Sequence, residues 1–165
     1  MKRVLVIGMS GTGKSSVLEE LQRRGYTVVD ADSEAWCELK SATVTALNET
    51  EPHEGWVWRE DLMTDLLQQK PDTPLFVSGC VSNQGKFYPL FDHVLLLSAP
   101  AEVMLERIAT RTNNPYGKTA VERTEILENL EFVEPLLRAG CDVEFDTSKL
   151  GVQQLADELV GLVNQ

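Results

Sequence analysis

The feature that most constrains this chain is a glycine-rich octapeptide close to its start, GMSGTGKS at residues 8–15. It matches the phosphate-binding loop pattern, in which a glycine and four further residues precede Gly-Lys-Ser/Thr. An apolar, β-branched run at 4–7 precedes the loop, and an amphipathic segment at 17–25 follows it. Because strand, loop and helix come in the required order, a chance glycine turn is the weaker interpretation.

The residue types in this loop predict how it binds a nucleoside triphosphate. Its glycines let backbone amides approach phosphate oxygens, and the following helix contributes the positive end of its dipole. Lys14 is expected to reach the β- and γ-phosphates as a catalytic residue, and the Ser15 hydroxyl is expected to bind Mg²⁺. We therefore expect ATP and Mg²⁺, with the nucleotide bound by Gly8, Met9, Ser10, Gly11, Thr12, Gly13, Lys14, Ser15 and Ser16.

Charge and hydropathy narrow the range of partners. Fifteen lysines and arginines stand against 26 acidic residues, which gives a formal net charge of −11. An acidic surface argues against a nucleic-acid partner, although the loop supplies its own local positive field for a nucleotide. No apolar run approaches the length needed to span a membrane, so we expect no membrane partner.

The cysteines and the first residues bear on location. Cys37, Cys80 and Cys141 are scattered, odd in number and without metal-ligand spacing. They are typical of reduced thiols, and residues 1–30 are not typical of a signal peptide. These features predict a cytoplasmic protein.

Two carboxylates follow the second expected strand, at 26–29. Asp30 and Asp32 stand at its carboxyl end, where α/β sheets bind their ligands. One is suited to hold Mg²⁺, and the other to orient or deprotonate a hydroxyl that attacks the γ-phosphate. The alternative is that they only cap the next helix.

The segment after these carboxylates is expected to form a helix at 33–47, a polar loop at 48–55 and a second helix at 56–69. Trp56, Trp58 and Arg59 are placed where an acceptor pocket could use them, the tryptophans as its floor and Arg59 for an anionic group. The alternative is that the tryptophans belong to the core and that Arg59 is solvated.

A third buried strand is expected at 74–79. It ends in Ser78, where such strands usually carry an acid. Either Ser15, the phosphates and Asp30 hold the metal, or Ser78 positions a metal-bound water. The following stretch, 80–88, is predicted to contact the acceptor through Asn83, Gln84 or Lys86, and the alternative is a helix cap and a surface turn.

The second half of the chain supplies a predicted lid. A strand at 93–98 and a helix at 100–108 lead into Arg107, Arg111 and the turn-forming run NNPYG at 113–117. Such a flap can bring an arginine to the phosphates and exclude water, although an ordinary surface loop is the alternative. A long helix at 119–138, bent near Pro135, a strand at 143–145 and a helix at 152–163 complete the pattern.

These elements predict a three-layer α/β/α sandwich around a five-stranded parallel sheet. We expect a single P-loop domain over residues 1–165. An acceptor-side insertion at about 33–73 and a lid at about 107–119 would flank a site at the carboxyl ends of the strands.

The loop at 8–15, Asp30-Ala31-Asp32 and Trp58-Arg59 together resemble the nucleoside monophosphate kinase group of P-loop proteins. Within that group the chain is most similar to shikimate kinase-like small-molecule kinases and small ATP-binding proteins of the AAA type. The resemblance implies that Asp30 serves magnesium, Asp32 the acceptor hydroxyl and Arg59 the acceptor itself.

The same resemblance implies further site residues. The family has three consecutive glycines on the acceptor side, and in this chain only Gly79 matches them, which implies that Gly79 contacts the acceptor. Asn83 lies in the loop that follows and is expected to contact the acceptor too. Arg107 and Arg111 fall where lid arginines occur, with Arg111 as the catalytic one, and Asp146-Thr147-Ser148 resembles the turn near adenine. The arginine that holds the carboxylate of shikimate has no clear counterpart in the helix before Gly140.

The sequence thus predicts an ATP- and Mg²⁺-dependent kinase for a hydroxyl of a small cytosolic metabolite, with Lys14, Asp32 and Arg111 as catalytic residues. One alternative is a nucleoside monophosphate kinase, in which Arg59, Lys86 and the lid arginines would converge on a second phosphate. The other is a non-catalytic, regulatory ATP-binding module.

Overall fold

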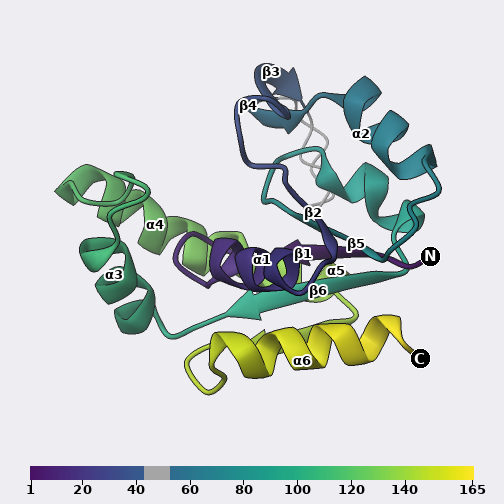
Figure 1. Cartoon of the computed structure of the whole chain (residues 1–165). Helices are drawn as coiled ribbons and strands as arrows, with labels where there is room; N and C mark the ends of the chain where they lie inside the picture. Colours follow the sequence, from purple (N-terminus) through teal and green to yellow (C-terminus); the bar gives the residue numbers. More distant parts are fainter. Residues whose placement is uncertain (43–52) are drawn as a thin grey trace.

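A parallel sheet of five strands forms the centre of the computed structural model, which describes residues 1–42 and 53–165 (Figure 1). Its strand order is β2-β5-β1-β6-β7, so the first strand is central, as the buried apolar run at its position predicts. The strands are β1 (Arg3–Ile7), β2 (Thr27–Asp30), β5 (Leu75–Ser78), β6 (His93–Ser98) and β7 (Val143–Asp146). The predicted five-stranded parallel sheet is therefore confirmed.

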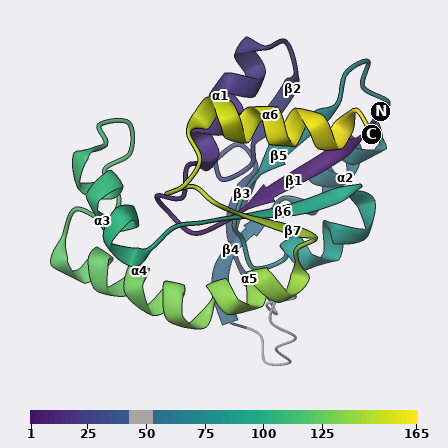
Figure 2. The same cartoon turned by 90° about the horizontal axis from the view of Figure 1, so that it is seen from below.

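Helices cover both faces of this sheet, which confirms the three-layer arrangement. One face carries α1 (Lys14–Arg23) and α6 (Val152–Val163), which lie side by side (Figure 2). The other face carries α2 (Glu60–Gln68), the 3-10 helix η2 (Gln84–Leu90) and α5 (Glu134–Gly140). Among the described helices, none is both long and apolar enough to span a membrane.

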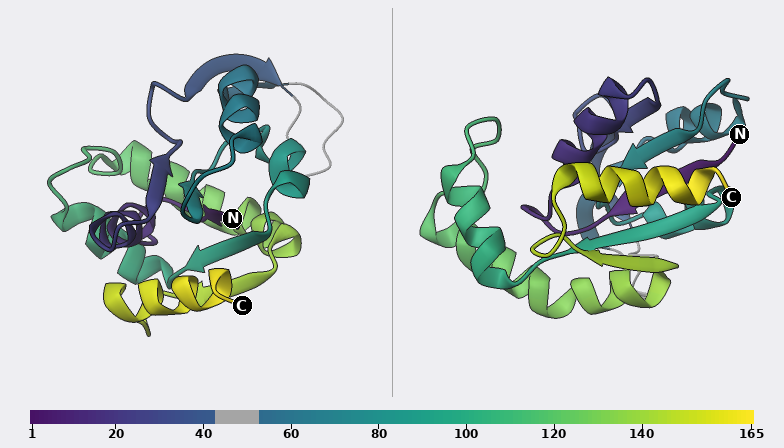
Figure 3. Two further views of the ribbon diagram at one scale, coloured as in Figure 1. Left: turned by 45° about the vertical axis from the view of Figure 1, so that its right-hand side comes forward. Right: turned by 60° about the horizontal axis from the view of Figure 1, so that its bottom comes forward.

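Two further helices extend past the carboxyl edge of the sheet. They are α3 (Ala101–Thr110) and α4 (Ala120–Phe132), and they project beyond the end of β6 (Figure 3). The helix predicted at 119–138 divides at Val133, which ends α4 and precedes α5. Pro135 lies in the first turn of α5, where a missing backbone N–H costs no hydrogen bond.

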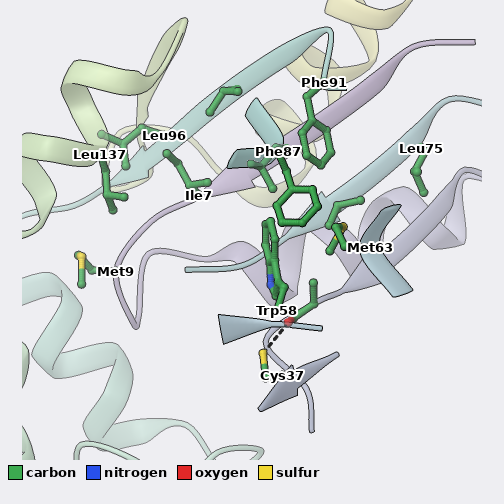
Figure 4. Packing of buried hydrophobic residues seen from close by; sticks show 14 of the residues in the cluster. Ile7, Met9, Cys37, Trp58, Met63, Leu75, Phe87, Phe91, Leu96 and Leu137 are labelled. Carbon is green, nitrogen blue, oxygen red and sulfur yellow. Dashed lines mark hydrogen bonds between the residues drawn. The ribbon is translucent and has the colours of Figure 1, made fainter. Parts of the chain in front are cut away.

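The strands alternate their side chains between two cores. In β1, Val4 and Val6 pack toward α1 and α6, whereas Leu5 and Ile7 pack toward the other layer. Both sets are fully buried, which explains the continuous apolar run in the sequence. The core between the sheet and the layer of α2, η2 and α5 contains an edge-to-face pair, Trp58 and Phe87, with ring centroids 5.8 Å apart (Figure 4).

The region between β2 and α2 differs from the prediction. Residues 33–47 and 56–69 are predicted to be helices, but Cys37–Ala42 forms β3 and His53–Trp58 forms β4, an antiparallel pair, and α2 begins only at Glu60. The predicted helix end at 43–47 and most of the predicted loop, 48–52, lie outside the described residues.

The register of this hairpin gives the physical reason for the error. Cys37 pairs with Trp58 and Leu39 pairs with Trp56, so at this end of the hairpin each strand carries two apolar residues spaced two positions apart, before Ser41 and Glu54 interrupt the pattern. That is the period of a strand, and tryptophan also favours strands. The helical interpretation counted the same residues at looser spacing and missed the alternation.

Candidate functional site

The glycine-rich loop joins β1 to α1 in the conformation that its sequence requires. Gly13 stands immediately before α1 with φ of 99°, a left-handed value that residues with a Cβ rarely adopt. Gly11 has φ of 83°, and a Cβ there would lie 3.0 Å from the Met104 carbonyl oxygen. The Thr12 hydroxyl, fully buried, donates to the Met9 carbonyl at 2.8 Å. The loop is thus held as a compact turn.

Lys14 lies over this loop rather than in solvent. Its Nζ donates to the carbonyl oxygens of Gly8 and, at 3.3 Å, Met9. The ammonium group therefore stays beside the backbone that would surround a phosphate group. Ser15 and Ser16, in the first turn of α1, line the same cavity as the loop.

A cavity of about 1040 Å³ opens at the carboxyl ends of the strands. All nine predicted nucleotide-binding residues of 8–16 line it, as do Asp30, Asp32, Ser78, Arg107, Arg111 and Thr147. A volume of this order accommodates a nucleotide or a nucleotide with a small second ligand. The structure thus brings most of the predicted site residues to one place.

Arg107 joins the glycine-rich loop to the last strand of the sheet. Its guanidinium donates to the Thr147 side-chain and backbone oxygens, both at 2.8 Å, and to the Gly11 carbonyl at 3.3 Å. Thr147 is itself buried and donates through its hydroxyl to the Thr12 carbonyl at 2.8 Å. Ser148 does not line the cavity, and its hydroxyl instead donates to Asp146 Oδ1.

Arg111 follows the end of α3 and reaches back to the loop. Its Nη2 donates to the Tyr116 carbonyl at 2.7 Å and to Ser10 Oγ at 3.3 Å. Burial lowers the pKa of this guanidinium from its ordinary value. Its buried Nε has no hydrogen-bond partner among the described residues. A cation with an unused donor therefore lies beside the loop, which favours an anion there.

The two carboxylates line the cavity at the end of β2 and just after it. Asp32 Oδ1 accepts a hydrogen bond from the backbone N–H of Cys80 at 2.8 Å, which ties the end of β2 to the residues after β5. Asp30 Oδ1 accepts one from the Asp32 N–H at 3.1 Å. Because turns and β3 follow these residues, the alternative that they cap a helix is wrong.

The oxygen donors around this cavity suit magnesium. Ser15 and Asp30 line it from two neighbouring elements, and Ser78 lines it at the end of β5. Within the described ranges, no group of three or more His, Cys, Asp and Glu side chains could hold a metal alone. Magnesium commonly binds through one or two carboxylates together with phosphate oxygens and water, so these residues fit an ion shared with a nucleotide.

Arg59, predicted to bind the acceptor, does not line the cavity. It directly follows β4, and its guanidinium forms an ion pair with Glu38 at 3.4 Å. Glu38 lies on the face of the hairpin opposite to Cys37 and Leu39, because side chains alternate along a strand. A strand at this place directs Arg59 away from the cavity, which the helical interpretation could not reveal.

Gly79 and Asn83 also stand outside the cavity wall and support Trp58. The Asn83 side chain accepts from the Trp58 N–H at 2.8 Å and donates to the Trp58 carbonyl at 3.0 Å. A Cβ on Gly79 would lie 2.7 Å from Trp58 Cζ2. Lys86 forms an ion pair with Glu60. Gly79 and Asn83 thus contact β4 rather than the cavity, and Lys86 contacts α2.

The sequence interpretation missed part of the cavity wall. Cys80, Val81 and Ser82 line it after β5, and Asn129, Val133 and Leu137 line it from α4 and α5. Burial raises the pKa of the Cys80 thiol to about 11, which keeps it protonated at neutral pH. For residues 80–82, their position directly after a buried strand was a signal in the sequence. For Asn129, Val133 and Leu137 there was none, because a helical pattern does not reveal which side of the helix faces a cavity.

Comparison with known proteins gives one family match. Residues 4–128 match the family model described as AAA domain. A shikimate kinase of Syntrophus aciditrophicus is 27% identical over 96% of this chain and 89% of its own length. A protein of Carboxydothermus hydrogenoformans named "Nucleotide-binding protein" is 30% identical over 97% of this chain, but over 53% of its own length. The chain thus spans about half the length of the nucleotide-binding proteins it matches.

Solved structures agree with the fold. The shikimate kinase of Acinetobacter baumannii in complex with shikimate has a TM-score of 0.65 and 19% identity, covering 99% of this chain and 93% of its own. The deoxyadenosine kinase of M. mycoides with bound dATP has a TM-score of 0.63 and 12% identity, with full coverage of both chains (100%). The predicted resemblance to P-loop small-molecule kinases is confirmed at the level of the fold.

Proposed function

The chain belongs to the AAA domain family, and from this premise we propose that it is an ATP- and Mg²⁺-dependent kinase acting on a hydroxyl group of a small metabolite. The observation that carries the proposal is that a single cavity contains a phosphate-binding loop on one wall and the Asp30 and Asp32 carboxylates on another. Phosphoryl transfer needs this pairing of a phosphate cradle with a group that orients the attacking hydroxyl.

The loop side of the cavity would bind and orient the triphosphate. Backbone amides of residues 8–15 and the N-terminus of α1 face phosphate oxygens in such loops. Lys14 Nζ, which lies on the Gly8 and Met9 carbonyls, would exchange these partners for phosphate oxygens. Arg111 would use its unpartnered Nε toward the charge that develops on the transferred group.

Ser15 and Asp30 would hold Mg²⁺, which neutralises charge on the β- and γ-phosphates when it is bound.

Asp32 would orient and deprotonate the acceptor hydroxyl. Its Oδ1 is held by the Cys80 N–H, which leaves Oδ2 to accept the proton. The hydroxyl oxygen forms a bond to the γ-phosphorus while the bond from that phosphorus to the β,γ-bridging oxygen breaks. The products are ADP and the phosphorylated acceptor, and the proton passes to Asp32.

Two segments would complete this enzyme, within a single domain at 1–165 located in the cytoplasm. The part between β2 and β5, about 33–73, would form the acceptor side. The part at about 107–119 would act as a lid, since Arg111, Asn113 and Asn114 line the cavity beside the loop. Closure over the bound substrates would exclude water and limit ATP hydrolysis.

A second candidate is a nucleotide-binding regulatory module without transfer activity. The names of the longer relatives favour it, and so does Ser78, which stands where an acid commonly helps to hold the metal. A nucleoside monophosphate kinase is less well supported, because Arg59 and Lys86 pair with Glu38 and Glu60 rather than converge on the cavity.

The experiment that separates these candidates is an assay of phosphoryl transfer from radiolabelled ATP to acceptors of different classes, with Mg²⁺. We expect acceptor-dependent turnover from the wild-type protein and none above background from Lys14→Ala, whose circular dichroism spectrum should be unchanged. Tight ATP binding without turnover on any acceptor would support the regulatory module instead. Equal turnover by Lys14→Ala would contradict the role given to the loop.

A further inference from the structure

The charges around the cavity narrow the class of the acceptor. Resting on the kinase function proposed above, we propose that the acceptor is an uncharged compound with several hydroxyl groups, of the sugar or polyol type. The argument depends on where the cavity carries positive charge, where it carries negative charge, and on one exposed tryptophan.

Every cation among the described cavity-lining residues belongs to the phosphate side. These cations are Lys14, Arg107 and Arg111. Lys14 lies on carbonyls of the loop, Arg107 contacts Gly11 and Thr147, and Arg111 contacts Ser10. A triphosphate bound by the loop would use these charges, so none remains for a second anion.

The acceptor side, by contrast, is acidic. Asp30 and Asp32 line it, and no lysine or arginine does within the part of the chain that the structure describes. The sequence of residues 43–52, TVTALNETEP, contains no lysine or arginine. A carboxylate or phosphate on the acceptor would therefore lie beside the Asp32 carboxylate with no lysine or arginine there to pair with it, and like charges at short range repel.

An amine on the acceptor is not required to balance these carboxylates. In the proposed function Asp30 holds Mg²⁺, and Asp32 takes the proton of the attacking hydroxyl. Both negative charges are thus used in the reaction itself, which leaves the rest of the acceptor to be recognised by uncharged groups.

Uncharged groups of suitable chemistry are present. Trp56 lines the cavity and is 56% exposed. The backbone carbonyl of Trp56 accepts a hydrogen bond from the Ser82 N–H at 2.9 Å, which joins β4 to the residues after β5. Ser33, Ser82 and Asn129 bring hydroxyl and amide groups to the same cavity. An aromatic face beside polar uncharged groups matches a compound with an apolar C–H face and several hydroxyls.

The test does not require the acceptor to be known beforehand. A small-molecule extract of bacterial cells is passed over an anion exchanger and then a cation exchanger, which yields an anionic, a cationic and an uncharged fraction. Each fraction is incubated with the full chain, Mg²⁺ and ATP labelled in the γ-phosphate, and label is sought in products other than ATP and free phosphate. We expect transfer with the uncharged fraction alone.

The possible outcomes separate the two proposals. Transfer with the anionic or the cationic fraction, and not with the uncharged one, would overturn the inference while supporting the kinase function. No transfer with any fraction, from protein that binds ATP in calorimetry, would overturn the kinase function and the inference with it.

Variants of the hairpin test the role of Trp56. We expect Trp56→Ala to raise the KM of the purified acceptor about tenfold while the KM for ATP changes less than twofold, and Trp56→Phe to restore most of the loss. Leu39→Ala is the matched control, because Leu39 pairs with Trp56 in the hairpin and is 55% exposed but does not line the cavity. Equal effects of Trp56→Ala and Leu39→Ala would contradict a direct contact with the acceptor.

Discussion

Asp32 is the residue on which the proposed chemistry can be tested most directly. An Asp32→Asn variant keeps a side-chain oxygen that can accept the hydrogen bond from Cys80, so the end of β2 should stay tied to the residues after β5. It cannot accept the proton of a hydroxyl. We therefore expect kcat to fall by about 10²- to 10⁴-fold, with ATP affinity changed less than about threefold.

Steady-state kinetics and isothermal calorimetry with ATP would measure the two quantities. The matched control is Asp72→Asn, an exposed aspartate outside the cavity, which should change neither. A parallel loss of ATP affinity and turnover in Asp32→Asn would instead indicate that Asp32 acts through the metal or the fold.

Gly79 provides a test of packing at the level of a single methyl group. A Cβ at this position would lie 2.7 Å from Trp58 Cζ2, and the Trp58 residue is fully buried, so displacing its ring would disturb the surrounding core. We expect Gly79→Ala to lower the free energy of unfolding by about 1–3 kcal/mol, as overpacking of a core does.

The control for Gly79 lies in α6, where Gly161 has nothing within 4 Å of an added Cβ. Gly161→Ala should raise the free energy of unfolding by about 0.5–1 kcal/mol, because alanine favours the helix and restricts the unfolded chain. Urea denaturation would measure both. A stable Gly79→Ala variant would show that Trp58 can be displaced.

At the scale of elements, the acids and bases that join α5 to β7 predict a pH dependence. Arg138 donates to Glu144 at 2.6 Å and to Glu134 at 2.9 Å, and the Ser98 hydroxyl donates to Glu144 at 2.8 Å. The hydrogen bonds from Arg138, followed by that from Ser98, hold the pKa of Glu144 below its usual value of 4.5. The folded state therefore binds this proton less readily than the unfolded chain does.

The sign of the effect follows from that difference. A lowered pKa in the folded state contributes stability above pH 4.5, and that stability is lost as the pH falls through the folded value. We expect Glu144→Gln to be less stable than the wild type by about 1 kcal/mol at neutral pH, since the pair is partly exposed.

Urea denaturation of both proteins at a series of pH values from neutral to below 4.5 should show this gap narrowing as the pH falls through the lowered pKa of Glu144 and the folded wild type becomes protonated as well. A gap that stays constant over the whole range would mean that glutamine loses packing rather than charge. Glu134 is present in both proteins, so the opposite effect of burial, which raises its pKa, largely cancels from the comparison.

The elements also show where sequence interpretation succeeds and where it fails. The central strands β1, β5 and β6 could be predicted because each is a short apolar run that is buried almost throughout, whereas the edge strands β2 and β7 are less buried. The β3–β4 hairpin was missed because its alternation is interrupted by polar residues, and because Trp36, Leu39, Trp56 and Leu62 also fit a loose helical spacing. Propensity alone could not decide between the two patterns.

The candidate site divides in the same way. Its phosphate side is one continuous segment whose residue order encodes its geometry, so residues 8–16 could be placed from the sequence. Its other side is assembled from the ends of β2 and β5, one strand of the hairpin, and α4 and α5. The register of those elements decides which of their side chains face the cavity, and the sequence does not reveal that register. Arg59 was expected in the site but pairs with Glu38 outside it, whereas Asn129 was not expected and lines the cavity.

At the scale of the whole molecule, binding of ATP and Mg²⁺ should increase the free energy of unfolding. At a concentration one hundred times the dissociation constant, a ligand that binds only the folded state adds about 2.7 kcal/mol. For a chain of this size that corresponds to a rise in Tm of about 5–10 °C. We expect this rise with ATP and Mg²⁺ in the wild type and at most about a quarter of it in Lys14→Ala.

Scanning fluorimetry at fixed protein and ligand concentrations would make this comparison, with Lys149→Ala as the control for loss of one surface charge, since Lys149 is 80% exposed at its side chain. An unchanged rise in Lys14→Ala would mean that the nucleotide binds elsewhere.

The contact between Thr147 and Thr12 joins two parts of the chain that are separated by 135 positions. Arg107 strengthens the same junction from α3. If the glycine-rich loop changes its conformation when a nucleotide binds, the residues between Thr147 and the start of α6 would therefore have to move with it.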